Sequence, residues 1–143
     1  MGNHLMLFVH LVWATDRRRP LLQPSLEADL HEYIQLKSRV LRCPVLAIGG
    51  MPDHVHLLVE LHPTLSVSAL AKEIKGTSSH AASRLGAGRD FSWQTGYGAF
   101  SVSRRDLPRA TAYVLCQKEH HAAGTLSSVL ESLPLPSTGA PPR

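Results

Sequence analysis

The run His54-Val55-His56 places two potential metal ligands at the start of an apolar segment that extends to Leu61. This segment is typical of a β-strand, in which successive side chains point to opposite faces. Both imidazoles therefore project from one face, with Cα atoms roughly 6.6 to 7 Å apart, and can converge on one divalent cation. The motif alone is a weak signal, because two histidines on a solvated sheet face are about as common as a ligand pair.

A third ligand is expected on the last helix of the chain. Two neutral imidazoles hold a divalent ion only weakly, so the site requires at least one more donor. Tyr113 and Gln117 are four residues apart and share one helix face, so both can address the same point in space. A mixed set of imidazole and amide oxygen ligands suits Mg²⁺ or Mn²⁺ acting at a phosphate.

Tyr113 is the candidate nucleophile. A phenolate can attack phosphorus and can leave again, so the resulting phosphotyrosine stores the bond for later rejoining. The metal would polarise the phosphate and stabilise the charge that develops on its oxygens. The alternative is a half-buried aromatic with its hydroxyl in water, which is the commoner case for an arbitrary helix tyrosine.

The elements that must position these residues follow from the apolar patterning. Branched and aromatic runs favour strands, and apolar residues near the helical period favour helices. We predict strands at residues 5–13, 45–48, 55–61, 91–93 and 97–102, with a glycine-rich turn at 49–53. We predict helices at 25–41, from 66 to about 86, and from 106 to 124.

Capping residues and apolar spacing define the expected ends and inner faces of these helices. We expect Ser25, Ser66 and Asp106 to act as N-caps, and Pro108 to fit the first turn of the last helix. Glycines should end the second and third helices. The expected inner faces comprise Leu26, Leu30, Ile34, Leu36 and Val40 in the first helix, and Val67, Leu70, Ala71, Ile74, Ala81 and Leu85 in the second.

The order strand, helix, strand, strand, helix, strand, helix is the split βαβ order of ferredoxin-like domains. We therefore expect an α+β fold, an antiparallel sheet with helices on one face plus an added C-terminal catalytic helix. A chain of 143 residues with 43% hydrophobic content suits one domain. We predict a single domain at residues 1–124 and a disordered tail at 125–143, which ends in a run rich in Pro and Ser.

The charge of the chain is compatible with a polyanionic partner. Lys and Arg number 15 against 11 Asp and Glu, and arginine, which dominates this excess, matches phosphate oxygens. Two groups of cations can track a DNA backbone, although ordinary solvated charge is the competing interpretation for each member. They are Arg17, Arg18 and Arg19 after the first strand, and Lys72, Lys75 and Arg84 on the second helix.

Other side chains leave alternatives open or carry no assignment. Aromatic residues can stack on unpaired bases or pack in the core, and the candidates are Trp93, Tyr97 and Phe100. Cys43 and Cys116 lack a CxxC spacing, so we expect reduced structural thiols. His10 and His31 have no partner by spacing.

The apolar run from Leu5 to Trp13 is shorter than the roughly 20 residues of a membrane span. It also lacks a basic leader and a cleavage site, so secretion is not expected. We therefore expect no membrane partner and a cytoplasmic protein that is nucleoid-associated when on DNA.

Five segments between about His10 and His121 resemble the HUH-superfamily tyrosine transposases of the insertion-sequence two-hundred type: VHLVWATDRRRPLL, GGMPDHVHLLVEL, LSVSALAKEIKGTSS, WQTGYGAFSVS and AYVLCQKEHH. Related domesticated proteins act on repetitive palindromic elements. The resemblance implies that His54 and His56 bind the metal, that Gln117 completes the metal site and that Tyr113 is the nucleophile. It also implies a protein that cuts single-stranded DNA beside hairpins at element ends and becomes linked to a 5′ phosphate. The family works as a homodimer in which one chain's tyrosine helix serves the other's histidines.

Two other hypotheses remain. After His121 the chain departs from the acidic and aromatic continuation of the family. This departure raises the alternative of a catalytically degenerate DNA-binding protein or repressor derived from such a transposase. An unrelated metallohydrolase is the third hypothesis, and it is weakened because Leu57 and Leu58 follow the histidine pair instead of further ligands.

Overall fold

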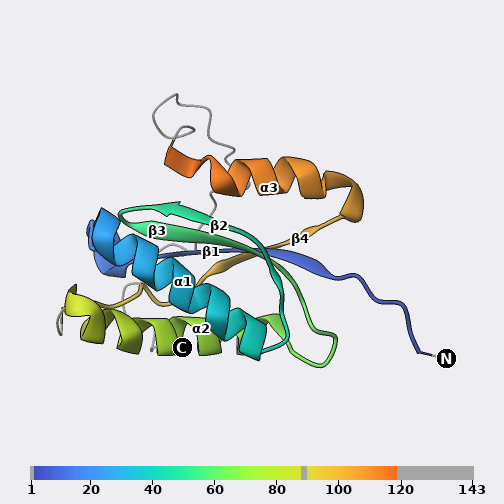
Figure 1. The fold of residues 1–143 in the computed structure, drawn as a ribbon, viewed down its shortest axis with the longest axis horizontal. Helices are drawn as coiled ribbons and strands as arrows, with labels where there is room; N and C mark the ends of the chain where they lie inside the picture. Colours follow the sequence, from blue (N-terminus) through green and yellow to red (C-terminus); the bar gives the residue numbers. More distant parts are fainter. Residues whose placement is uncertain (1, 88–89, 119–143) are drawn as a thin grey trace.

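A four-stranded antiparallel sheet with the strand order β2-β3-β1-β4 forms the centre of the molecule (Figure 1). The computed structural model describes residues 2–87 and 90–118. The strands are β1 Phe8–Ala14, β2 Val45–Met51, β3 His54–Glu60 and β4 Gly98–Val102. The helices are α1 Pro24–Val40, α2 Val67–Ala82 and α3 Leu107–Leu115, with short helical turns η1 Asp16–Arg18, η2 Ser83–Ala87 and η3 Arg104–Asp106.

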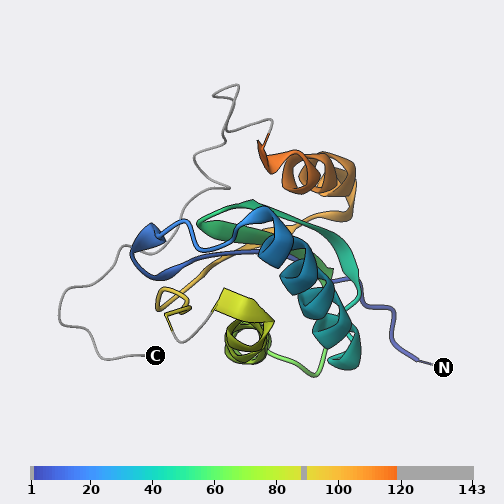
Figure 2. The same ribbon diagram turned by 60° about the vertical axis from the view of Figure 1, so that its left-hand side comes forward.

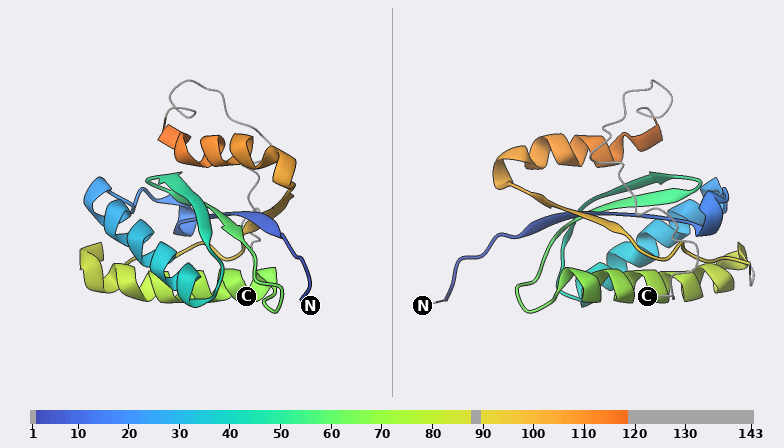
Figure 3. Two further views of the ribbon diagram at one scale, coloured as in Figure 1. Left: turned by 45° about the vertical axis from the view of Figure 1, so that its right-hand side comes forward. Right: turned by 180° about the vertical axis from the view of Figure 1, so that it is seen from behind.

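Helices cover both faces of the sheet. Helices α1 and α2 lie side by side on one face, and α3 lies on the opposite face (Figures 1 and 2). The order of elements and of strands confirms the ferredoxin-like prediction with an added C-terminal helix. The two views in Figure 3 show the same separation, so a residue's position in the strand alternation decides which helices it meets.

The two faces hold cores of different size. The face under α1 and α2 carries the main core, to which β1 and β3 contribute Val9, Leu11, Trp13, Val55, Leu57 and Val59. The face under α3 carries a smaller cluster of Ala47, Leu58, Ala110 and Val114. Because side chains alternate along a strand, the intervening residues His10, His54 and His56 point toward the α3 face.

Strand β1 begins later than predicted. It starts at Phe8, which pairs with Glu60 at the end of β3, so the residues before it have no opposite strand. Leu5 is 50% exposed, and Met6 and Leu7 are exposed as well. The apolar run therefore begins before the strand, because pairing with β3, and not hydrophobicity, decides where β1 starts.

Helix α1 begins one residue before the predicted cap and buries a different face. Gln23 is its N-cap and Pro24 its first residue, so the prediction of Ser25 as the cap is wrong. Leu36 is 50% and Val40 73% exposed, whereas Ser38 is buried. Ser38 follows the buried Ile34 by four residues and therefore shares its face, while Leu36 lies about 200° away around the helix.

The turn between β2 and β3 is shorter than predicted. Gly49 and Gly50 belong to β2, which extends to Met51, so only Pro52 and Asp53 separate the two strands. Backbone hydrogen bonds tie this turn to the segment after β1, since the Asp53 carbonyl accepts from the Thr15 amide at 2.9 Å. The turn is thus held next to η1.

Helix α2 begins as predicted, but the segment after it differs. The Ser66 hydroxyl accepts from the Ala69 amide, which confirms Ser66 as the N-cap. Leu85 is 45% exposed in η2, so its assignment to the inner face is wrong, because the helix changes its geometry before Gly86 at φ 104°. The predicted strand at residues 91–93 is reduced to one bridge between Trp93 and Thr15.

Helix α3 begins at the predicted position. Asp106 occupies the N-cap position and Pro108 lies in the first turn, but the Asp106 side chain makes no capping hydrogen bond. The Ser103 hydroxyl instead accepts from the Asp106 amide. The predicted continuous helix up to Gly124 is wrong, because α3 ends at Leu115 and the chain turns at Cys116. Gly124 itself, the domain boundary and the tail lie outside the described residues. None of the helices in the described part of the chain has the length and apolar character that a membrane crossing requires.

Candidate active site

His54 and His56 lie next to each other on the face of β3 that α3 covers. Their ring centroids are 5.1 Å apart and the ring planes meet at 71°. His54 is 1% and His56 0% exposed. The predicted alternation therefore brings both imidazoles into the interface between the sheet and α3.

Helix α3 places Tyr113 against His56. The centroids of the two rings are 6.0 Å apart, with the rings edge to face at 73°. Tyr113 is 8% exposed, and its helix is held by the contacts of Ala110 and Val114 with the sheet. The phenol and the histidine pair thus meet within one chain.

Gly49 is what allows α3 to approach the sheet so closely. A Cβ atom at this position would lie 2.0 Å from the Val114 carbonyl oxygen, which is far inside van der Waals contact. Gly49 also faces His56 in the register of β2 and β3. The missing side chain therefore lets the α3 backbone rest on β2 directly beside the histidine pair.

Gln117 lies over the same glycine. The chain turns at Cys116 and resumes helical geometry at Gln117, whose Cγ would be 3.7 Å from a Cβ on Gly49. Its Nε2 donates to the Tyr113 carbonyl at 2.9 Å. Since that carbonyl can only accept, the amide oxygen must point elsewhere. The Gln117 Oε1 atom is buried and has no hydrogen-bond partner among the described residues. Buried polar atoms normally have a partner, so this oxygen is a candidate ligand atom.

An acidic residue outside the predicted site supports His54. The Asp53 carboxylate lies 2.7 Å from His54 Nδ1 and 3.3 Å from Arg18 Nε. The His54 hydrogen bond, aided by Arg18 and opposed by partial burial, lowers the pKa of Asp53 to about 2. An ionised carboxylate can only accept, so His54 Nδ1 carries the proton, and the lone pair of the neutral ring lies on Nε2.

His56 is supported by His10, a histidine for which sequence spacing indicates no partner. His10 Nε2 lies 2.8 Å from His56 Nδ1, and the two rings are 5.0 Å apart. Both residues are fully buried. The sequence places His10 in a predicted strand but gives it no partner, because only the register of β1 against β3 brings it beside His56.

The described residues contain no group of three His, Cys, Asp or Glu side chains that could hold a metal ion. The candidate ligand set is accordingly His54, His56 and the amide oxygen of Gln117. The Nδ1 atoms of His54 and His56 each make a hydrogen bond, and the Gln117 Oε1 atom has no hydrogen-bond partner among the described residues. The residues present therefore fit a divalent cation of mixed nitrogen and oxygen coordination.

Residues 4–117 match the family model described as "Transposase IS200 like", which covers well over half of the chain. The chain belongs to the IS200-like transposase family. The family inferred from the sequence segments is thereby confirmed.

Relatives of this transposase-family chain include the ISDra2 transposase TnpA of Deinococcus radiodurans, which is 29% identical over 77 residues. That alignment spans 54% of this chain and 55% of the relative, so it covers about half of the curated protein.

Two solved structures share the fold of this IS200-like transposase family chain. One is a Deinococcus radiodurans R1 protein assigned as a transposase, with a TM-score of 0.67 at 23% identity over 80% of this chain and 92% of that one. The other is a REP-associated tyrosine transposase bound to a REP hairpin, with a TM-score of 0.62 at 18% identity over 100% of this chain and 98% of that one.

The arginines predicted to bind DNA lie near the histidine pair of this IS200-like transposase family member. They belong to η1 and the residue after it, beside the turn that carries Asp53. The Arg17 side chain is 85% exposed, Arg18 pairs with Asp53, and Arg19 donates to the Asp90 carbonyl at 3.0 Å. Arg17 is therefore the most accessible of the three to a phosphate.

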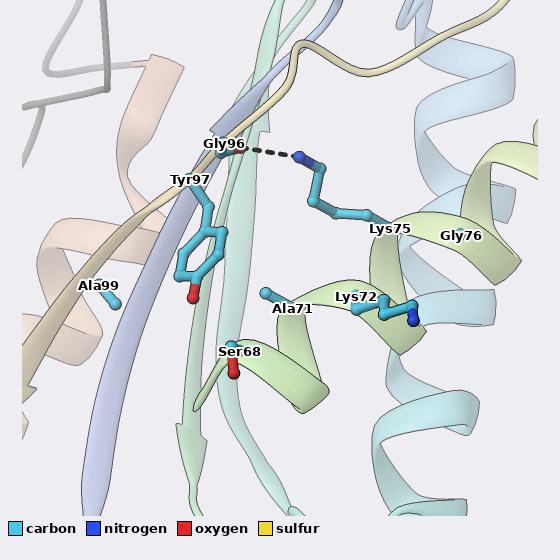
Figure 4. A pocket seen from close by; sticks show the side chains of 8 residues that line it. All are labelled: Ser68, Ala71, Lys72, Lys75, Gly76, Gly96, Tyr97 and Ala99. Carbon is cyan, nitrogen blue, oxygen red and sulfur yellow. Dashed lines mark hydrogen bonds between the residues drawn. The ribbon is translucent and has the colours of Figure 1, made fainter. Parts of the chain in front are cut away.

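The other predicted cations lie on the opposite face of the sheet, on α2 and the turn after it. A cavity of about 720 Å³ separates α2 from the segment that leads into β4, and Lys72, Lys75 and Tyr97 line it (Figure 4). Lys75 Nζ donates to the carbonyls of Gln94 and Gly96 at 2.8 and 2.7 Å, and burial lowers its pKa to about 8.

The three aromatic candidates differ in their surroundings. Trp93 packs in the main core, where its indole nitrogen donates to the Ser78 hydroxyl at 3.0 Å. Tyr97 lines the cavity, and its ring projects toward α2 (Figure 4). Phe100 lies 6.0 Å from the His10 ring on the α3 side of the sheet. Core packing therefore accounts for Trp93, whereas Tyr97 has access to a cavity.

Replacing Gly49 with alanine should separate α3 from the sheet, because the new methyl group would collide with the Val114 carbonyl. We expect a loss of about 1 to 3 kcal/mol in the free energy of unfolding. Amide hydrogen exchange in α3 should also accelerate relative to α2. Gly76→Ala is the matched control, because no heavy atom lies within 4 Å of a Cβ built there. Unchanged exchange in α3 of Gly49→Ala would show that the close approach is not needed.

Proposed function

We propose that this protein is a metal-dependent transposase that cuts and rejoins single-stranded DNA at hairpin-flanked element ends through a 5′-phosphotyrosine intermediate. The observation that carries the proposal is the 6.0 Å separation of the Tyr113 and His56 rings in a buried site that also holds His54. Membership of the IS200-like transposase family supports DNA as the substrate.

The residues of the site divide the chemistry between them. His54, His56 and Gln117 would hold Mg²⁺ or Mn²⁺, and Asp53 orients His54 for this purpose. A bound cation would polarise the scissile phosphate and offset the charge that develops on its oxygens. The amide of Gln117 also links this ligand set to the tyrosine helix, since it donates to the Tyr113 carbonyl.

Tyr113 makes and breaks the covalent bond to DNA. Its phenol oxygen forms a bond to phosphorus while the bond from phosphorus to the 3′ oxygen breaks. The phenol loses a proton and the departing 3′ oxygen gains one, so a 5′-phosphotyrosine and a free 3′ hydroxyl remain. Attack by another 3′ hydroxyl reverses these steps and joins the strands, and no nucleotide cofactor is consumed.

The DNA contacts are proposed on both sides of the sheet. Arg17, Arg18 and Arg19 would guide the backbone near the histidine pair. Lys72, Lys75 and Arg84 would hold a further stretch of the strand along α2, where Tyr97 can stack on an unpaired base in the cavity. We place this activity in the cytoplasm, on chromosomal DNA.

The tyrosine should be the site of covalent attachment. The full chain is incubated with Mn²⁺ or Mg²⁺ and hairpin-forming single strands taken from the DNA that flanks its coding region. We expect a denaturant-resistant protein–DNA adduct that a chelator prevents. Tyr113→Phe should abolish the adduct because the nucleophilic oxygen is gone, while hairpin binding persists.

Tyr33→Phe on α1 makes the same chemical change away from the site and should leave the adduct intact. An adduct that survives Tyr113→Phe, or one that forms in the presence of the chelator, would refute the mechanism. Hairpin binding by the wild-type protein without any adduct would favour the alternative, a catalytically degenerate DNA-binding protein or repressor.

We further propose that the protein is a homodimer with the active site shared between chains. The apolar part of the contact between α3 and the sheet is small, with Ala47, Leu58, Ala110 and Val114 as its buried apolar residues. Exchange of this helix between two copies would therefore break few contacts, and each copy would offer the other the same surface.

Mixing two inactive variants tests this arrangement. Tyr113→Phe lacks the nucleophile and His56→Ala lacks a metal ligand, so each should form no adduct alone. In a shared site, co-folded mixed dimers contain one complete centre, and about half of their sites should regain adduct formation. If no activity returns although mixed dimers form, each chain uses its own tyrosine, as the contact between Tyr113 and His56 within one chain allows.

The proposed cations should contribute to the salt dependence of binding. Each phosphate neutralised on a single strand contributes about 0.7 to the slope of log affinity against log salt concentration. Arg17→Ala and Lys72→Ala should each reduce that slope by about this amount in fluorescence anisotropy titrations. Lys37→Ala is the control, because Lys37 pairs with Glu73 at 3.7 Å. An unchanged slope in either test variant would place that residue outside the DNA path.

A further inference from the structure

His10 makes a direct hydrogen bond to one of the candidate metal ligands, and its ring is held in place on two sides. Its Nε2 lies 2.8 Å from His56 Nδ1, with the ring planes tilted by 33°. On the neighbouring strand, Phe100 pairs with His10 in the register of β1 and β4, and its ring lies 6.0 Å away. The imidazole therefore has a defined position at the centre of the sheet.

The bond between the two rings contains one proton, and the location of that proton decides whether His56 can bind a metal. If His56 Nδ1 carries it, the neutral ring keeps a lone pair on Nε2 for a cation. If His10 Nε2 carries it, His56 Nδ1 becomes the acceptor and the proton of neutral His56 resides on Nε2. Only the first arrangement is compatible with His56 as a metal ligand.

His54 and His56 thus receive different kinds of support. The Asp53 carboxylate can only accept, so the tautomer of His54 is determined by its partner. His10 can donate or accept, so the tautomer of His56 depends on the proton distribution within a pair of histidines. A leucine would fill the space of His10 without burying a polar ring, so packing alone does not account for an imidazole there.

We propose that His10 is a positioning residue of the metal site, which accepts the Nδ1 proton of His56 and thereby presents the Nε2 of His56 as the ligand atom. This inference rests on the proposed function in one respect, the use of His56 as a ligand. Partners of this kind typically alter metal affinity by about 10- to 100-fold when they are removed.

Mn²⁺ binding to the full chain without DNA provides the first readout. His10→Leu removes the acceptor and should raise the Kd for Mn²⁺ by about 10- to 100-fold in calorimetric titrations. His10→Gln places an amide oxygen near the former Nε2 and should recover most of the affinity. His80→Gln and His80→Leu make the same changes at an exposed residue of α2 and should leave the Kd unchanged.

The wild-type protein provides a second readout that requires no variant. We expect nitrogen-15 correlation spectra at a fixed, mildly alkaline pH to show His56 of the Mg²⁺-saturated protein with its proton on Nδ1 and a bare Nε2. A proton on Nε2 of His56 in that sample, or wild-type affinity for Mn²⁺ in folded His10→Leu, would overturn the role of His10.

The same titrations separate this inference from the function on which it rests. If His56→Ala binds Mn²⁺ as tightly as the wild type, His56 is not a ligand, and the inference and the proposed metal site fail together. If His56→Ala loses Mn²⁺ binding while His10→Leu keeps it, the inference about His10 fails and the proposed function stands.

Discussion

The site depends on the close approach of the α3 backbone to β2 at Gly49. The Val114 carbonyl occupies space that any side chain at residue 49 would need, and His56 is the residue that faces Gly49 on β3. Tyr113 precedes Val114 and Gln117 follows it in the chain. The contact between Val114 and Gly49 therefore sets the distance of both side chains from the imidazoles. A small steric feature of a strand therefore determines whether the phenol and the amide can both lie close to the histidine pair.

Polar side chains at the centre of a sheet require partners, because burying them without hydrogen bonds costs free energy. Arg18, Asp53 and His54 form one connected set. His10 of β1 and His56 of β3 form a second. These hydrogen bonds satisfy buried polar groups and also fix the orientation of the imidazole rings. The stability of the sheet centre and the geometry of the histidine pair therefore depend on the same hydrogen bonds.

The two faces of the sheet differ in the kind of side chains that they bury. The main core lies under α1 and α2, where large apolar side chains such as Trp13 and Leu57 are fully buried. The α3 face has only a small apolar cluster, and the space beside it holds histidines. Because the larger core stabilises the fold, the α3 face can accommodate polar side chains in the interior of the protein.

The sequence alone determined the features that arise from local periodicity. The alternation of a strand places His54 and His56 on one face. The four-residue spacing predicts a shared side for Tyr113 and Gln117, and they remain neighbours although α3 ends at Leu115. The order of the elements indicated the ferredoxin-like topology, and Ser66 was correctly identified as the cap of α2. Each of these features depends on residues that are only a few positions apart.

Tertiary structure decided everything that depends on contacts between distant segments. Glycine is typical of turns, and only the packing of α3 against the sheet shows why Gly49 lies in a strand. Leu36 is apolar yet exposed, because the packing of α1 against α2 and the sheet decides which helix face is buried. The pairing of His10 with His56 requires the register of β1 against β3, which depends on the packing of the whole sheet and has no local signal in the sequence.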